Sequence, residues 1–108
     1  MHFNEYQKEA AGTNIVKDEF KLIHAVLGLA GEAGEVCEKF KKMYRDKQGV
    51  IDNDFRKAVA GELGDVSWFL ADVCTQLGLD FDYVVTSNLE KLRSRRERGT
   101  IQGNGDNR

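Results

Sequence analysis

Proline is absent from the 108 residues, and there are only two cysteines and one tryptophan. Without proline, no predicted helix contains a residue that would kink or end it. Cys37 and Cys74 have neither the spacing of a zinc site nor the density of a disulfide scaffold. We therefore expect reduced, mostly buried thiols in a cytoplasmic protein.

Long hydrophobic runs are also lacking. No segment approaches the ~18 apolar residues that a membrane-spanning helix needs. The first residues, MHFNEYQKEA, are polar and have no apolar core of the kind found in signal peptides. The length and composition predict one soluble domain over residues 1–108, without a membrane partner.

The charge is distributed unevenly along the chain. Residues 1–90 carry 16 Asp and Glu against 10 Lys and Arg, whereas residues 91–108 carry 6 basic against 2 acidic residues. A basic end on an acidic body is typical of an anion-binding segment. It is also typical of a solvated helix end, where cations favour the helix C-terminus. Charge alone leaves both interpretations open.

Apolar residues recur at intervals of three and four, and strand-like alternation is scarce. This spacing predicts helices over about 3–11, 19–45, 53–77 and 81–98, followed by an irregular tail over 98–108. Asp18 and Asp52 are expected to cap the second and third helices, and Gly78 to end the third. Long helices with short links predict an all-α fold, an antiparallel four-helix-type bundle.

One acidic, glycine-containing phrase occurs twice, as AGEAGEV at 30–36 and as AGELGDV at 60–66. Its glycines, Gly31, Gly34, Gly61 and Gly64, lie inside predicted helices. Each should cost roughly 1 kcal/mol relative to alanine. We expect the missing side chains to let the two helix backbones approach each other closely.

Each of these glycines precedes an acid: Glu32, Glu35, Glu62 and Asp65. The i, i+3 spacing places each pair on one helix face. Either pair alone is typical of a solvated face, but two matched copies favour convergence. Converging carboxylates repel one another unless a cation lies between them, and oxygen ligands suit Mg²⁺ or Mn²⁺. Glu38, three residues beyond Glu35, is a candidate fifth oxygen donor or water-orienting base.

Mg²⁺ held by carboxylates with open positions typically binds phosphates. Asn88, Lys91 and Arg95 share one helix face and are candidates to hold the outer phosphates of a nucleotide. The loop 103–106 could approach phosphate through its backbone N–H groups. From composition, a frayed terminus is the simpler interpretation of that loop.

Three aromatic residues are candidates for a pocket that holds a nucleobase, Phe3, Tyr6 and Trp68, and His2 is a further candidate beside the first two. Trp68 lies one turn beyond Asp65 and could stack on a base, although a core or interface position is the simpler interpretation. His24 is expected to be structural.

The arrangement Glu32-x-x-Glu35, 26 intervening residues, then Glu62-x-x-Asp65 resembles the ExxE…ExxD signature of MazG-type nucleotide pyrophosphohydrolases. The segments NLEKLRSR (88–95) and GNGDNR (103–108) are similar to small single-domain members of this all-α group. The resemblance covers about residues 20–108.

The resemblance implies Mg²⁺-dependent hydrolysis of a (deoxy)nucleoside triphosphate to the monophosphate and diphosphate. Glu32, Glu35, Glu62 and Asp65 would bind the metal, and a metal-activated water would attack the α-phosphorus. Glu35 or Glu38 would orient or deprotonate that water, and the Asn88, Lys91 and Arg95 face would hold phosphates. It further implies a homodimer or homotetramer whose sites can borrow residues from a neighbour, and no nucleic-acid partner.

Two alternatives stay open. The acids could form a docking surface in a non-catalytic helical interaction module. The same fold could also act on phosphoribosyl-ATP. The sequence does not specify the base or the sugar of the substrate.

Overall fold

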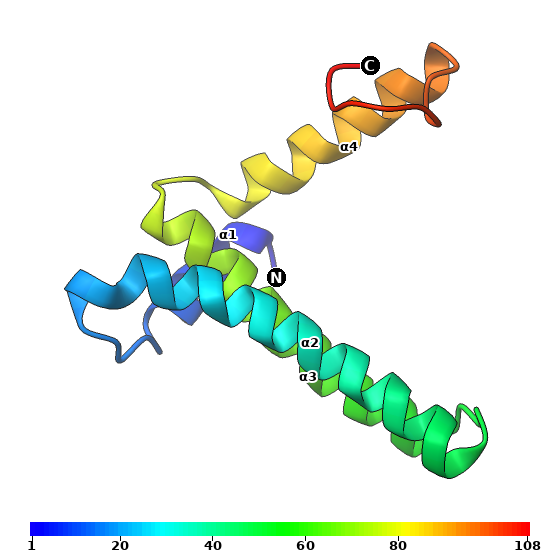
Figure 1. Cartoon of the computed structure of the whole chain (residues 1–108). Coiled ribbons are helices and arrows are strands. Elements are labelled where there is room, and N and C mark those ends of the chain that lie inside the picture. Colours follow the sequence, from blue (N-terminus) through cyan, green and yellow to red (C-terminus); the bar gives the residue numbers. More distant parts are fainter.

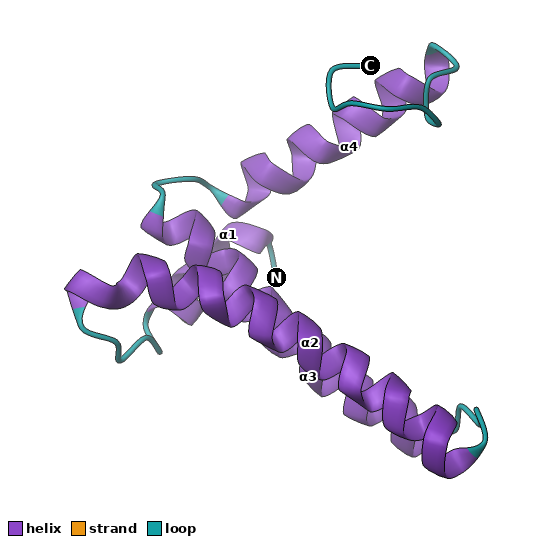
Figure 2. Cartoon of the chain, viewed as in Figure 1, coloured by secondary structure: helices purple, strands orange, loops and turns teal.

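The computed structural model describes all 108 residues and contains helices and loops without strands (Figure 2). The elements are α1 (Phe3–Ala11), the 3₁₀ helix η1 (Asp18–Phe20), α2 (Lys21–Lys47), α3 (Asn53–Gln76) and α4 (Phe81–Glu97). The all-α prediction is confirmed, and the predicted boundaries agree to within two residues. None of the helices combines the length and apolar character that crossing a membrane requires.

α2 and α3 form a long hairpin and lie side by side (Figure 1). The turn between them begins at Gln48 and Gly49, which adopt left-handed backbone conformations with φ of 56° and 79°. Asp52 then caps α3 as predicted, since its Oδ1 accepts a hydrogen bond from the Phe55 N–H at 2.8 Å.

The predicted cap of the preceding helix is wrong. Asp18 begins the 3₁₀ turn instead, and α2 starts three residues later at Lys21 without a side-chain cap. The Asp18 carboxylate lies 3.0 Å from the Lys21 ammonium group, so it pairs with a charge rather than with the helix N–H groups.

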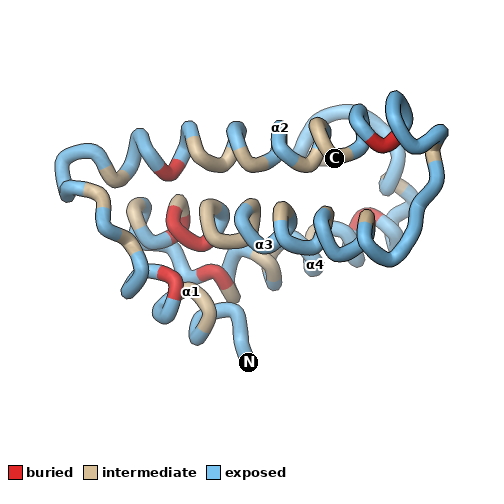
Figure 3. The backbone as a smooth tube through the Cα atoms, turned by 90° about the horizontal axis from the view of Figure 1, so that it is seen from below, coloured by how far each residue is buried: buried red, intermediate tan, exposed pale blue.

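The helix faces that meet in the hairpin carry residues spaced by three and four. Figure 3 shows the buried and half-buried positions of α2 and α3 facing each other. These positions are Ala25, Gly28, Glu32, Val36, Lys39 and Met43 on α2, and Phe55, Val59, Glu62, Val66, Phe69 and Val73 on α3. Glu32 and Glu62 therefore occupy positions that would ordinarily be apolar.

The expected close approach through the repeated glycines is wrong. A Cβ atom added at Gly31, Gly34, Gly61 or Gly64 would meet no atom within 4 Å, and all four are exposed. Each lies one residue, about 100°, from an acid that faces the hairpin interface or its edge. Gly28, three residues before Gly31, is crowded instead, since an added Cβ would collide with the Phe69 ring.

Side chains of α1 join the end of α3 to the start of α4. Gln7 Oε1 accepts from the Phe81 N–H at 2.9 Å, and its amide group donates to the Leu79 carbonyl at 2.8 Å. Asn4 Oδ1 accepts from the Asp82 N–H at 3.0 Å. These contacts satisfy free N–H groups at the start of α4 and so fix its direction after α3 ends before Gly78.

α4 leads away from the α2–α3 hairpin (Figure 1), so a single chain does not form the expected four-helix bundle. The radius of gyration is 16.9 Å, against about 13 Å for a compact chain of this length. The apolar period of the fourth helix would bury Val84, Leu89 and Leu92 in such a bundle, but in the single chain they are exposed at 36%, 46% and 39%.

Both cysteines are free thiols. Cys74 is buried as expected, whereas Cys37 is exposed, so the prediction of mostly buried thiols holds for one of the two.

Candidate metal and nucleotide site

Three of the predicted acids converge between α2 and α3. One carboxylate oxygen from each of Glu32, Glu62 and Asp65 lies within 4.8 Å of the other two. Glu32 and Glu62 are half-buried, and Asp65 is exposed at the edge of the interface. The two copies of the repeated phrase thus meet across the hairpin, as predicted, and we call these three residues the acidic cluster.

The acidic cluster is short of positive charge. Partial burial raises the pKa of Glu32, and the negative charges of Asp65, Glu62 and Glu35 raise it further. The one cation paired with the cluster is Lys39, whose Nζ lies 3.7 Å from Glu62 Oε1. Three converging carboxylates with one paired lysine leave excess negative charge, and their hard oxygen donors suit a divalent cation such as Mg²⁺.

Lys39 was not assigned to the site from the sequence. It lies seven residues after Glu32, and two full turns of helix bring such residues onto one face. This spacing would have indicated that Lys39 shares the interface with the acid.

Glu35 and Glu38 lie outside the acidic cluster. Glu35 is exposed, one turn along α2 from Glu32, and its charge contributes to the raised pKa of that residue. Glu38 accepts a hydrogen bond from Lys41 at 2.8 Å, which together with the charge of Lys41 lowers the pKa of Glu38. A lowered pKa makes a weaker base. The metal-binding role of Glu35 and the catalytic roles of both residues stay predictions.

A cavity of about 270 Å³ lies where the start of the chain, α3 and the start of α4 meet, and one of its lining residues, Ser67, follows Asp65 by two positions on α3. Two of the three predicted base-pocket residues, Phe3 and Tyr6, line it. Burial raises the pKa of the Tyr6 hydroxyl, and the negative charge of Asp65 raises it further. The lining is mainly apolar, and its members are Met1, His2, Phe3, Tyr6, Ser67 and Phe81.

Trp68, the third base-pocket candidate, does not line this cavity. Its Nε1–H donates to Thr13 Oγ1 at 2.8 Å, and its ring meets Phe69 edge-on at 4.9 Å. The core or interface interpretation of Trp68 is therefore the one that the structure supports. The His24 ring also packs against Phe69, with centroids 5.6 Å apart, as expected of a structural histidine.

Met1, Ser67 and Phe81 line the cavity but were not predicted to do so. They come from the start of the chain, from α3 and from the start of α4, and no sequence spacing connects them. Phe81 meets Phe3 with ring centroids 5.1 Å apart because α1 crosses the junction of α3 and α4.

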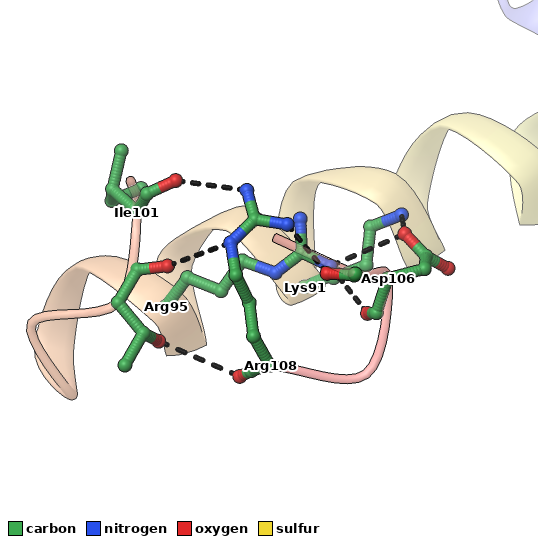
Figure 4. Close-up of polar contacts among 7 residues, drawn as sticks. Lys91, Arg95, Ile101, Asp106 and Arg108 are labelled. Atoms are coloured by element: carbon green, nitrogen blue, oxygen red, sulfur yellow. Dashed lines mark hydrogen bonds and ion pairs between the residues drawn. The ribbon is translucent and has the colours of Figure 1, made fainter. Parts of the chain in front are cut away.

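The predicted phosphate-binding residues Asn88, Lys91 and Arg95 are all on α4, which leads away from the acidic cluster (Figure 1). A single chain therefore does not bring them to the acids. Lys91 and Arg95 do share a helix face as predicted, since both contact Asp106 of the C-terminal tail (Figure 4).

No solved structure matches this chain. A curated relative, the Gene 37 protein of Mycobacterium phage L5, is 45% identical over an alignment of 114 residues that covers all of both chains. The family model described as the MazG nucleotide pyrophosphohydrolase domain matches residues 20–100, a span that holds the acidic cluster and all of α4. This match confirms the resemblance inferred from the repeated acidic phrase: the chain belongs to the MazG nucleotide pyrophosphohydrolase domain family.

Proposed function

We propose that this chain hydrolyses a nucleoside triphosphate to the monophosphate and diphosphate at the acidic cluster, with Mg²⁺ as cofactor. The observation that carries the proposal is the convergence of Glu32, Glu62 and Asp65 from two copies of one phrase on adjacent helices. Acids without a binding role are expected on the solvated faces of the helices, because two facing acids in an interface repel each other and oppose packing.

Glu32, Glu62 and Asp65 would hold the metal, with Glu35 within one turn as a further oxygen donor. When bound, Mg²⁺ would neutralise phosphate charge and lower the pKa of a water molecule in the site. Mn²⁺ prefers similar oxygen ligands and could replace it.

In the proposed reaction, a water oxygen forms a bond to the α-phosphorus while the bond from that phosphorus to the α–β bridging oxygen breaks. The proton of the water passes to a carboxylate, for which we propose Glu35, and diphosphate leaves. Glu38 is the second choice for this role, since its hydrogen bond with Lys41 lowers its pKa. The cavity lined by Phe3 and Tyr6 would hold the base.

We further propose that the chain works as a homodimer or homotetramer. α2 exposes a row of large apolar residues near its start, Leu22, Ile23, Val26 and Leu27, and α4 exposes Leu89 and Leu92. Burying such residues between copies is favourable. A neighbouring copy would then also bring the Asn88, Lys91 and Arg95 face of its α4 to the acidic cluster, and so complete the site. Reduced thiols favour a cytoplasmic location for this activity.

The test is a panel of NTPs, dNTPs and phosphoribosyl-ATP, each incubated with the purified protein and Mg²⁺, with identification of the products. We expect monophosphate and diphosphate from one or more nucleoside triphosphates, and no turnover in EDTA. Release of inorganic phosphate from the γ-position would place the protein in another reaction class. An inert wild-type protein would favour the helical interaction module.

The matched variants are Glu62→Gln and Glu90→Gln. Glu62 belongs to the acidic cluster, whereas Glu90 is an exposed acid on α4 outside it. We expect Glu62→Gln to lower kcat/KM on the order of 100-fold or more, since it removes a charged oxygen ligand. Glu90→Gln should retain activity, and circular dichroism should show equal helix content in both.

A further inference from the structure

The last ten residues fold back along α4 as an organised loop. The chain reverses at glycines with left-handed backbones, among them Gly99 with φ of 70° and Gly105 with φ of 85°. The Arg108 guanidinium group closes the loop by donating to the Thr100 carbonyl at 3.1 Å and to the Ile101 carbonyl at 2.9 Å (Figure 4). The tail is therefore held in one place rather than frayed.

This loop places Asp106 on the basic face of α4. Lys91 Nζ lies 2.6 Å from Asp106 Oδ1, and an Arg95 Nη2–H donates to the same oxygen at 3.2 Å and to the Asp106 backbone carbonyl (Figure 4). Arg95 is 5% exposed, which is rare for arginine and occurs here because the tail covers it. The hydrogen bonds from both cations lower the pKa of Asp106, so its carboxylate is charged at neutral pH.

Lys91 and Arg95 thus already hold an anion, with one carboxylate oxygen bridging two cations as a phosphate oxygen would.

We propose that residues 99–108 act as an autoinhibitory strap, in which Asp106 occupies the anion site of Lys91 and Arg95 and must leave before that site takes a phosphate group. The role of this site in the reaction rests on the function proposed above. The competition between the strap and a polyphosphate for Lys91 and Arg95 does not rest on that function, because it concerns binding and not hydrolysis.

The strap is suited to be a weak competitor. The Lys91 and Asp106 side chains are 37% and 77% exposed, and an ion pair open to solvent in this way contributes little. A diphosphate or triphosphate carries several charges and many acceptor oxygens, so it displaces one carboxylate even though the tail is tethered at a high effective concentration. Removing the carboxylate charge should therefore strengthen phosphate binding by about fivefold.

The first test is a calorimetric titration of the full chain with inorganic pyrophosphate in metal-free buffer, where the acidic cluster does not recruit the ligand through a metal. Asp106→Asn should bind pyrophosphate about fivefold more tightly than the wild type. Glu97→Gln, which removes the same charge from an exposed position on α4, should change binding far less. Equal or weaker binding by Asp106→Asn, or no binding by either protein, would overturn the proposal.

The second test uses the wild type alone and does not depend on a variant that folds. Hydrogen exchange of the backbone amides in residues 99–108 is measured with and without saturating pyrophosphate. We expect faster exchange with the ligand, because the strap is released. Unchanged or slower exchange would show that the tail stays in place or folds over the ligand. Strap release without hydrolysis in the substrate panel would leave this inference standing and remove the proposed function.

Discussion

Glu32 shows how one side chain can be costly to the fold and useful to the site. It takes a place in the hairpin interface that an apolar residue would ordinarily hold, and three other acids raise its pKa along with partial burial. Without a cation, its charge is poorly solvated and repelled. Such local cost is typical of binding sites, where stability is given up for function.

The pH dependence of stability should report this cost. The pKa of Glu32 is raised above its ordinary value of 4.5 in the folded state. The folded chain therefore binds the proton more readily than the unfolded chain, and Glu32 lowers stability as pH rises through the interval above 4.5. We expect Glu32→Gln in EDTA to be more stable than the wild type at pH 7, with a difference that shrinks towards pH 4.

Urea unfolding of both proteins between pH 4 and 8 measures this difference. Comparing the two proteins cancels the opposite contributions of Glu38, Asp46 and Asp106, whose lowered pKa values make stability fall at low pH. Mg²⁺ should stabilise the wild type more than Glu32→Gln. A variant less stable than the wild type at pH 7 in EDTA would contradict the assignment of Glu32 as an uncompensated charge.

Two glycines of α2, Gly28 and Gly31, have different surroundings in the α2–α3 hairpin and should differ in their effect on stability when replaced. Gly28 faces the ring of Phe69, which also packs against the rings of His24 and Trp68. Gly31 lies three residues further along α2 and faces open space within the chain. The two positions are in the same helix, so they share the same intrinsic preference for alanine.

Gly28→Ala and Gly31→Ala should therefore change stability in opposite directions. We expect Gly28→Ala to lower the free energy of unfolding by about 1–3 kcal/mol through overpacking. Gly31→Ala should raise it by up to about 1 kcal/mol, because alanine restricts the unfolded chain and fits the helix. Thermal unfolding at one protein concentration measures both. A destabilising Gly31→Ala would indicate that another copy of the chain covers this face.

The protein as a single chain is an open arrangement rather than a closed core. Eight of 108 residues are buried, and the apolar faces of α2 and α4 are uncovered. The two copies of the acidic phrase meet within the α2–α3 hairpin. The basic face of α4 lies on a helix that leads away from that hairpin (Figure 1). This separation is the physical reason for proposing that the complete site forms only in an assembly.

Light scattering should accordingly give a mass that is a multiple of the 12.2 kDa chain. Leu89→Glu places a charge on the exposed apolar face of α4 and should shift the mass towards that of one chain, with loss of activity. Ser94→Glu adds the same charge about 140° around the helix and should leave the mass unchanged. A monomeric, fully active wild type would refute the assembly.

Several features were readable from the sequence because they are local. The apolar period gave all four helices, the Asp52 cap and the end of α3 before Gly78 are confirmed, and the doubled phrase predicted the meeting of Glu32, Glu62 and Asp65. Hydrophobic period, cap chemistry and i, i+3 spacing all act within a few residues, so a short stretch of chain specifies them.

Other features arose only when distant segments met in space. The repeated glycines are exposed, and Glu32 and Glu62 take the interface positions instead, since a rotation of about 100° decides which of two neighbouring residues faces the partner helix. The direction of α4 depends on hydrogen bonds from α1, more than 70 residues away, and the contact of Asp106 with Lys91 and Arg95 depends on the glycine turns of the tail. Such outcomes depend on contacts between segments whose separation along the chain carries no periodic signal.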